Sequence, residues 1–147
     1  GLWKLNKFRK GKNMAVQQIL SYVSDDENCL SLKRVYDNKN VLSHIYVFNA
    51  KGKIYKCLFY EKGVRLSNMS IYNPETGKEI RNITYRQDGK TISSAREYNL
   101  ETGKLSCVTF FKSDGISVSS IIEYDDYGSQ VQFSLFCDDG EVITSQL

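Results

Sequence analysis

Aromatic residues recur along this chain at intervals of 12 or 13, and each is followed a few residues later by a glycine or another turn-forming residue. This spacing is that of a strand that ends in an aromatic residue and is followed by a turn, because β-strands are short and glycine accepts turn conformations. The aromatic positions are Tyr36, Phe48, Tyr60, Tyr72, Tyr85, Tyr98, Phe111, Tyr124 and Phe136.

The chain also contains a repeat that is longer than this spacing. Residues 72–78 (Tyr-Asn-Pro-Glu-Thr-Gly-Lys) recur almost unchanged at 98–104, a shift of 26 residues. A second turn type alternates with the first and contains Asp-Gly pairs at 88–89, 114–115 and 139–140, which are strong hairpin signals. The repeating unit is therefore a hairpin of about 26 residues, with two strands and two kinds of turn.

These patterns predict a mainly β fold, an antiparallel meander of about nine or ten strands in a twisted or rolled sheet, over residues 29–147. In most strands an aliphatic residue precedes the closing aromatic by six, as with Leu42 and Phe48. This even offset predicts that both lie on one face of the sheet. Ile80 and Val131 precede their aromatics by five instead, so we expect a bulge or shifted register in those two strands.

Residues 1–28 have a different character. Val16, Ile19, Leu20 and Val23 have helical spacing and predict a short helix. Upstream, Trp3, Leu5 and Phe8 either form an extended strand or dock beside the sheet. The first twelve residues hold five cations and no acid, a basic arm that is a candidate for contact with an anionic membrane or nucleic acid: Lys4, Lys7, Arg9, Lys10 and Lys12.

The bulk composition is that of a soluble globular domain, with 41% hydrophobic residues and a formal net charge of +3. We expect a cytoplasmic protein, or a secreted or surface-anchored one if a signal or anchor preceded Gly1. The cysteines Cys29, Cys57, Cys107 and Cys137 form no paired motif, and His44 is the only histidine. We therefore expect free thiols, a reducing compartment and no metal site.

Catalytic signatures are weak. His44 lies in an apolar strand, the paired acids fall at predicted turns, and no glycine-rich phosphate loop appears. We therefore expect no catalytic residues and no cofactor. Candidates for protein binding are the aromatic residues on the second, only partly apolar face of the sheet: Tyr55, Phe59, Phe110 and Phe133.

The alternating motifs at 72–78 and 85–92 resemble a tandem repeat family of unknown function from phytoplasmas and lactobacilli. More loosely, the aromatic-glycine hairpins resemble the MORN-variant repeats of YwqK-type bacterial antitoxins. The resemblance implies an all-β repeat protein without known catalytic residues. We therefore expect a non-enzymatic scaffold that binds another protein, as an antitoxin or immunity factor or as a host-interacting surface or effector protein. The alternatives are a membrane- or nucleic-acid-associated module that uses the basic arm and, third, a hydrolase.

Overall fold

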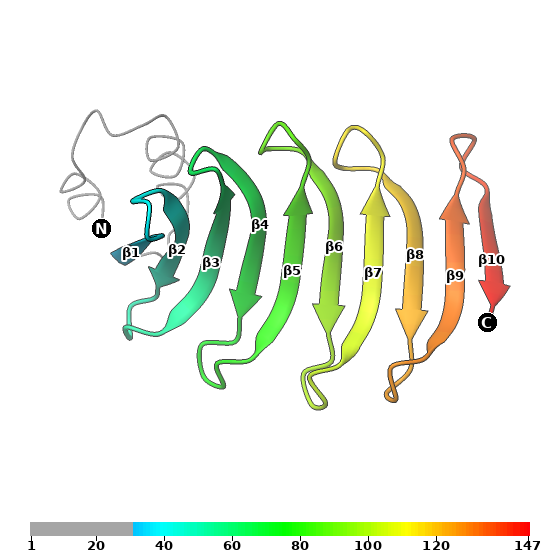
Figure 1. The fold of residues 1–147 in the computed structure, drawn as a ribbon. Helices are drawn as coiled ribbons and strands as arrows, with labels where there is room; N and C mark the ends of the chain where they lie inside the picture. Colours follow the sequence, from blue (N-terminus) through cyan, green and yellow to red (C-terminus); the bar gives the residue numbers. More distant parts are fainter. Residues whose placement is uncertain (1–30) are drawn as a thin grey trace. The chain divides into compact units, whose positions relative to one another are not determined.

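A computed structural model describes residues 31–147 of the chain (Figure 1). The predicted basic arm and helix at residues 1–28 lie outside this range. The predicted antiparallel meander is confirmed: the described residues form ten strands in the sheet order β1-β2-β3-β4-β5-β6-β7-β8-β9-β10, and no helix occurs among them.

The chain divides into two compact units at Gly77/Lys78. The strands of the first unit are β1 (Ser31–Tyr36), β2 (Leu42–Phe48), β3 (Ile54–Glu61) and β4 (Arg65–Tyr72). Those of the second unit are β5 (Glu79–Tyr85), β6 (Ile92–Tyr98), β7 (Leu105–Phe111), β8 (Val118–Tyr124), β9 (Gln130–Phe136) and β10 (Val142–Gln146). Every one of the nine spaced aromatics is the last or next-to-last residue of its strand, as the repeat predicts.

An Asn or Asp directly after the closing aromatic organises most turns. The side-chain oxygen of Asn49, for example, accepts hydrogen bonds from the backbone N–H groups of Lys51 and Lys53, both at 3.0 Å. Asp125 does the same for Tyr127 and Ser129 at 2.9 Å. Such side chains mimic a backbone turn, which explains why these residues recur in the repeat.

A β-bulge occurs near the start of most strands, a regularity that the sequence pattern alone did not reveal. Val35 pairs with His44 but the next residue, Tyr36, pairs with Leu42, so that Ser43 is an extra residue in β2. The same shift recurs along the sheet and leaves seven extra residues: Ser43, Tyr55, Ser67, Ser93, Ser106, Ser119 and Val131. The irregularity expected around Val131 is thus confirmed and recurs in six other strands, while the one expected around Ile80 stays a prediction.

The bulge corrects the predicted face assignment. An extra residue reverses the alternation of side chains, so Leu42 and Phe48 lie on opposite faces despite their even spacing. Leu42 instead shares its burial with Ile45 and Val47, at odd offsets. In the first unit the core is the cross-strand row of Ile45, Leu58 and Met69, and in the second unit Ile83 and Ala95 pair in the same manner.

Candidate binding surfaces

The second unit presents one sheet face with an unusual number of exposed apolar side chains. Cross-strand pairing joins Val108 to Ile122 and Ile122 to Phe133, and it joins Leu135 to Ile143 in the neighbouring row. Paired residues share a face, as do residues two apart in one strand. We call this surface the Phe110 face; its apolar residues are Val108, Phe110, Ile122, Phe133, Leu135 and Ile143.

Solvent exposure distinguishes the Phe110 face from the opposite one. Phe110, Leu135 and Ile143 are 39%, 38% and 50% exposed, whereas Val142 is the only large apolar side chain exposed within a strand on the opposite face of this unit. Folded proteins rarely expose clustered apolar side chains without a use for them.

The two faces of the second unit also differ in the number of charged residues that they carry. Two charged residues reach the Phe110 face of the second unit: Arg96 at a paired strand position, and Glu79, whose carboxylate accepts a hydrogen bond from the Asn82 side chain at 3.4 Å. The opposite face, which we call the Cys107 face, holds Arg81, Glu97 and Glu123, and the Arg81 Nε lies 3.7 Å from a Glu97 carboxylate oxygen. The Phe110 face is thus the less polar and the less charged of the two.

The Cys107 thiol shows no sign of activation. Cys107 and Cys137 are free cysteines, as expected. Burial raises the pKa of the Cys107 thiol, and the effect outweighs the opposing hydrogen bond with Thr109. A raised pKa keeps the thiol protonated and makes it a weak nucleophile.

In the first unit an aromatic strip follows one face of the strands. The His44 ring lies 5.0 Å from the Tyr46 ring in an edge-to-face arrangement and 5.8 Å from the Phe59 ring. The strip therefore uses the only histidine of the chain as a packing partner between two aromatic rings. Phe48 follows Tyr46 two residues later on the same face and leads to a pocket.

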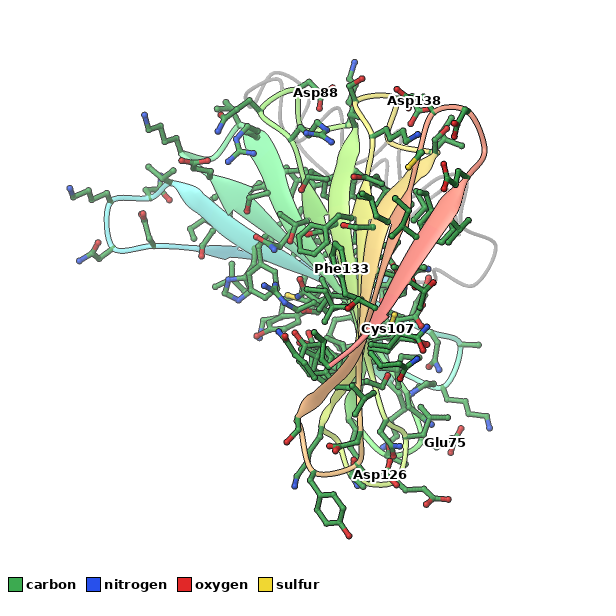
Figure 2. The ribbon with its side chains drawn as sticks, turned by 90° about the vertical axis from the view of Figure 1, so that its right-hand side faces the viewer. Glu75, Asp88, Cys107, Asp126, Phe133 and Asp138 are labelled. Atoms are coloured by element: carbon green, nitrogen blue, oxygen red, sulfur yellow. The ribbon has the colours of Figure 1, made fainter. Side chains whose placement is uncertain are left out.

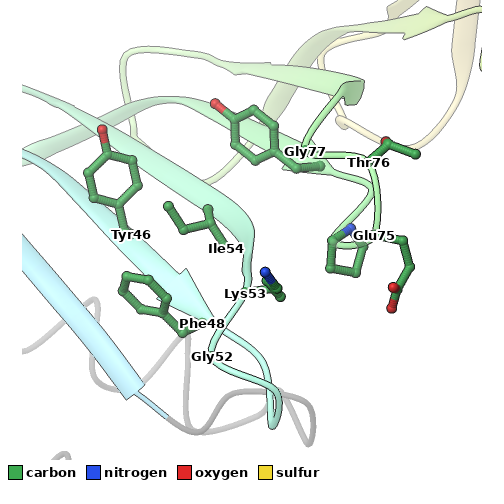
Figure 3. A pocket seen from close by; sticks show the side chains of 10 residues that line it. Tyr46, Phe48, Gly52, Lys53, Ile54, Glu75, Thr76 and Gly77 are labelled. Atoms are coloured by element: carbon green, nitrogen blue, oxygen red, sulfur yellow. The ribbon is translucent and has the colours of Figure 1, made fainter.

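This pocket of about 580 Å³ lies where the turn after β2 faces the turn after β4 (Figure 3). Apolar and aromatic side chains form its floor, and the rim is polar and exposed. The lining residues are Tyr46, Phe48, Gly52, Lys53, Ile54, Tyr72, Pro74, Glu75, Thr76 and Gly77. Sequence reasoning missed this site because it placed the closing aromatics of all turns on one face, whereas the bulges put Phe48 and Tyr72 on the strip's face and Tyr60, between them in the chain, on the other.

The four predicted protein-binding residues lie in different surroundings in the structure. Phe59 belongs to the aromatic strip, while Tyr55 is the bulge residue of β3, with the Lys56 ammonium 5.5 Å from its ring centre. Phe110 and Phe133 share the Phe110 face in the second unit. The basic-arm candidates Lys4, Lys7, Arg9, Lys10 and Lys12 lie outside the described residues, and their contact with anions stays a prediction.

The aspartates of the second unit sit in turns at the ends of the strands. Asp88 and Asp138 lie at one end and Asp126 at the other, with Phe133 and Cys107 between them (Figure 2). Hydrogen bonds from Thr91 and Ser117, together with backbone N–H groups, hold the pKa of Asp88 and of Asp114 at about 2. The Lys112 ammonium, 2.6 Å from Asp138, lowers the pKa of that carboxyl too. These three acids are ionised near neutral pH and are unsuited to donate a proton.

Residues 31–147 lack two further kinds of feature. Over this range there is no cluster of three or more His, Cys, Asp or Glu side chains that could bind a metal ion. The same residues contain no helix of the length and hydrophobicity needed to cross a membrane.

Comparison with known proteins found a match to a family of unknown function over part of the chain, and a similar fold in solved structures. Residues 59–109 match the model of a family described as a protein of unknown function, DUF2963. A search among curated proteins found no match. The family match covers the hairpins around the two best-formed turn motifs.

Among solved structures, the chain is similar to part of the GtfA/B complex bound to UDP and GlcNAc, with 12% identity and a TM-score of 0.58 over 78% of this chain. It is also similar to part of S. aureus TarM in complex with fondaparinux, alpha-GlcNAc-glycerol and UDP, with 10% identity and a TM-score of 0.55 over 96% of this chain. The matched regions are 24% and 26% of those chains, so this chain spans about a quarter of their length.

These matches contradict the prediction that the chain is not an enzyme. Sheets of this fold form part of chains whose structures hold UDP together with GlcNAc or a GlcNAc compound. The hairpin repeat therefore cannot serve as an argument against an enzyme. At 10–12% identity the likeness is one of fold, and it assigns no catalytic residue to this chain.

Proposed function

We propose that this chain is a protein-binding β-repeat module that holds a partner protein on the Phe110 face. The observation that carries the proposal is the set of exposed apolar side chains on this face, Phe110, Leu135 and Ile143, where charged side chains are few. Aromatic residues are enriched and charged residues depleted at the centre of protein interfaces.

The chemistry of the face defines the partner that fits it. The partner's contact surface is apolar and carries an acidic group that can meet the exposed Arg96 guanidinium. Small hydroxyl residues lie in the same cross-strand row as Phe110, with Ser94 and Ser120 on either side of it, so the face also offers hydrogen-bonding groups to a partner.

The fold comparison supports a modular role. In both similar structures the sheet is about a quarter of a longer chain, and GtfA/B is described as a complex. We infer that this sheet likewise works by association within a larger assembly. An antitoxin or immunity role, or a host-interacting role, would use the same face to cover a partner, as the loose likeness to MORN-variant antitoxin repeats implies.

Two adjacent residues of β10 offer a matched test. Ile143 and Thr144 are both exposed, but Ile143 lies on the Phe110 face and Thr144 on the Cys107 face. The wild type, Ile143→Lys and Thr144→Lys are used as baits in extracts of the native host, and captured proteins are quantified by mass spectrometry.

The proposal predicts a protein that wild type and Thr144→Lys capture equally and that Ile143→Lys loses by roughly tenfold or more, as expected for a charge in an interface core. Equal capture by both lysine variants would exclude the Phe110 face as the binding surface. Circular dichroism and thermal unfolding of the three proteins establish that the variants are folded.

A further inference from the structure

The pocket of the first unit is a separate site with a chemistry of its own. It lies in a different unit from the Phe110 face and does not depend on the proposed protein-binding function. Its volume of about 580 Å³ falls within the roughly 300–1,000 Å³ that is typical of small-ligand pockets.

The two walls of the pocket are held in place by the turns themselves. The Asn49 side chain accepts two backbone hydrogen bonds on one side, and the Asn73 side chain accepts two on the other, from the Glu75 N–H at 2.9 Å and the Thr76 N–H at 3.4 Å. The Gly77 N–H adds a backbone bond to the Asn73 carbonyl at 2.8 Å. A pre-formed wall lowers the entropy lost when a ligand binds.

Ring faces make up much of the floor. Tyr46, Phe48 and Tyr72 come from β2 and β4, and all three are half-buried, so that part of each remains accessible. The face of an aromatic ring is electronegative. It therefore attracts the polarised C–H groups that a pyranose ring presents on its less polar side.

The rim supplies both donors and acceptors. The Lys53 ammonium can only donate, and the Glu75 carboxylate can only accept. Glu75 lies 3.7 Å from the Lys51 ammonium across the gap between the turns, but both side chains are more than two-thirds exposed, so a ligand can compete with this weak ion pair.

We propose that this pocket binds an uncharged saccharide, with a pyranose ring against the aromatic floor and its hydroxyl groups bonded to Glu75 and Lys53. A hydroxyl group both donates and accepts, and so it satisfies each kind of rim group. A proline-rich peptide also fits aromatic grooves, but its backbone offers mainly carbonyl acceptors, which the Glu75 carboxylate would repel. An acidic ligand could pair with the Lys53 ammonium but would leave the Glu75 carboxylate without a donor.

The test uses saturation-transfer-difference NMR on the full chain with cellobiose, maltose, lactose and chitobiose, each at millimolar concentration. Glu75→Lys removes the acceptor from the rim. The matched control is Glu101→Lys, because residues 99–103 of the second unit repeat the turn at 73–77. Both glutamates are exposed, so neither change should affect folding.

We expect ring-proton signals from at least one saccharide with the wild type and with Glu101→Lys, and a roughly tenfold or greater weakening with Glu75→Lys, the effect of losing a hydrogen bond to a charged group. Tyr46→Ala, once shown to be folded, should weaken binding as well. The inference is overturned if no saccharide of the panel gives signals, if Glu75→Lys binds like the wild type, or if a proline decamer binds in a Glu75-dependent manner in place of the sugars.

Discussion

At the scale of single residues, the recurring serine at the bulge is the feature that most directly connects sequence to structure. The hydroxyls of Ser67, Ser93 and Ser106 each donate to a backbone carbonyl of the preceding strand, at 3.0 to 3.1 Å. A bulge leaves one residue without its regular ladder partner. The serine hydroxyl compensates by satisfying a carbonyl beside the bulge.

Replacing one of these serines should therefore cost stability only where the bond exists. Ser106→Ala removes the bond to the Glu97 carbonyl and should lower the free energy of unfolding by about 1 kcal/mol. Ser119 takes the equivalent position in β8, and within the described part of the chain its hydroxyl makes no such bond, so Ser119→Ala should change stability by less than about 0.5 kcal/mol. Urea unfolding measures both; equal losses would refute the role of the hydroxyl.

The turn aspartates predict a specific acid response. The pKa values of Asp88 and Asp114, about 2, lie below the ordinary value of 3.8, so both carboxylates stabilise the folded state above pH 3.8. That contribution is lost as the pH falls from 3.8 through 2. The double variant Asp88→Asn/Asp114→Asn should lose less stability than the wild type over this window, as measured by urea unfolding at each pH. Parallel curves would mean that other groups govern the acid response.

At the scale of elements, strands and turns could be predicted from the sequence because the aromatic spacing and the turn residues report on local conformation. The faces could not be predicted, because one extra residue per strand reverses the alternation and the simple two-residue period does not include it. The signal was present as an aliphatic-serine pair at the start of five strands, at Leu42-Ser43, Leu66-Ser67, Ile92-Ser93, Leu105-Ser106 and Val118-Ser119.

The pocket could not be predicted from the sequence for the same reason, because its lining depends on the bulges. Phe59, Phe110 and Phe133 could be chosen from the sequence as candidates because they are apolar residues on a face that is otherwise mixed. The meeting of Phe48 with Tyr72 requires knowledge of which turns face each other and on which side, which the bulges decide.

Neighbouring hairpins are also in close backbone contact at their turns. Gly115 has a φ of +69°, and a Cβ placed there would lie 2.7 Å from the Thr91 side chain and 3.0 Å from the Ile92 nitrogen. Gly128 has a φ of +87°, but a Cβ at that position would meet no atom within 4 Å. The first glycine is thus required by both conformation and space, the second by conformation alone.

Alanine substitutions separate these two requirements. Gly128→Ala should destabilise the protein by about 1–2 kcal/mol through the left-handed conformation alone. Gly115→Ala should cost at least about 1 kcal/mol more, because the added methyl group also overlaps the preceding hairpin. Thermal and urea unfolding provide the comparison, and a cost for Gly115→Ala no greater than that for Gly128→Ala would show that the hairpins can move apart freely.

At the scale of the whole molecule, the strand repeat produces two unlike faces in the second unit. Side-chain links between successive turns stabilise this arrangement: Arg86 donates to the carbonyls of Phe111 and Lys112, and Lys112 pairs with Asp138. Each link spans about one hairpin repeat. The sheet thereby presents the Phe110 face as a continuous surface from β7 to β10.

Hydroxyl-radical footprinting with mass spectrometry is the sharpest test of partner binding on the Phe110 face, because it reports the solvent exposure of individual side chains. In the free protein, Phe110, Leu135 and Ile143 should be oxidised readily. In complex with the captured partner, oxidation of these three residues should fall severalfold, while oxidation of Val142 and Cys107 on the opposite face should stay unchanged. Protection of Val142 and Cys107 with the Phe110 face still fully reactive would show that the partner binds the other side of the sheet.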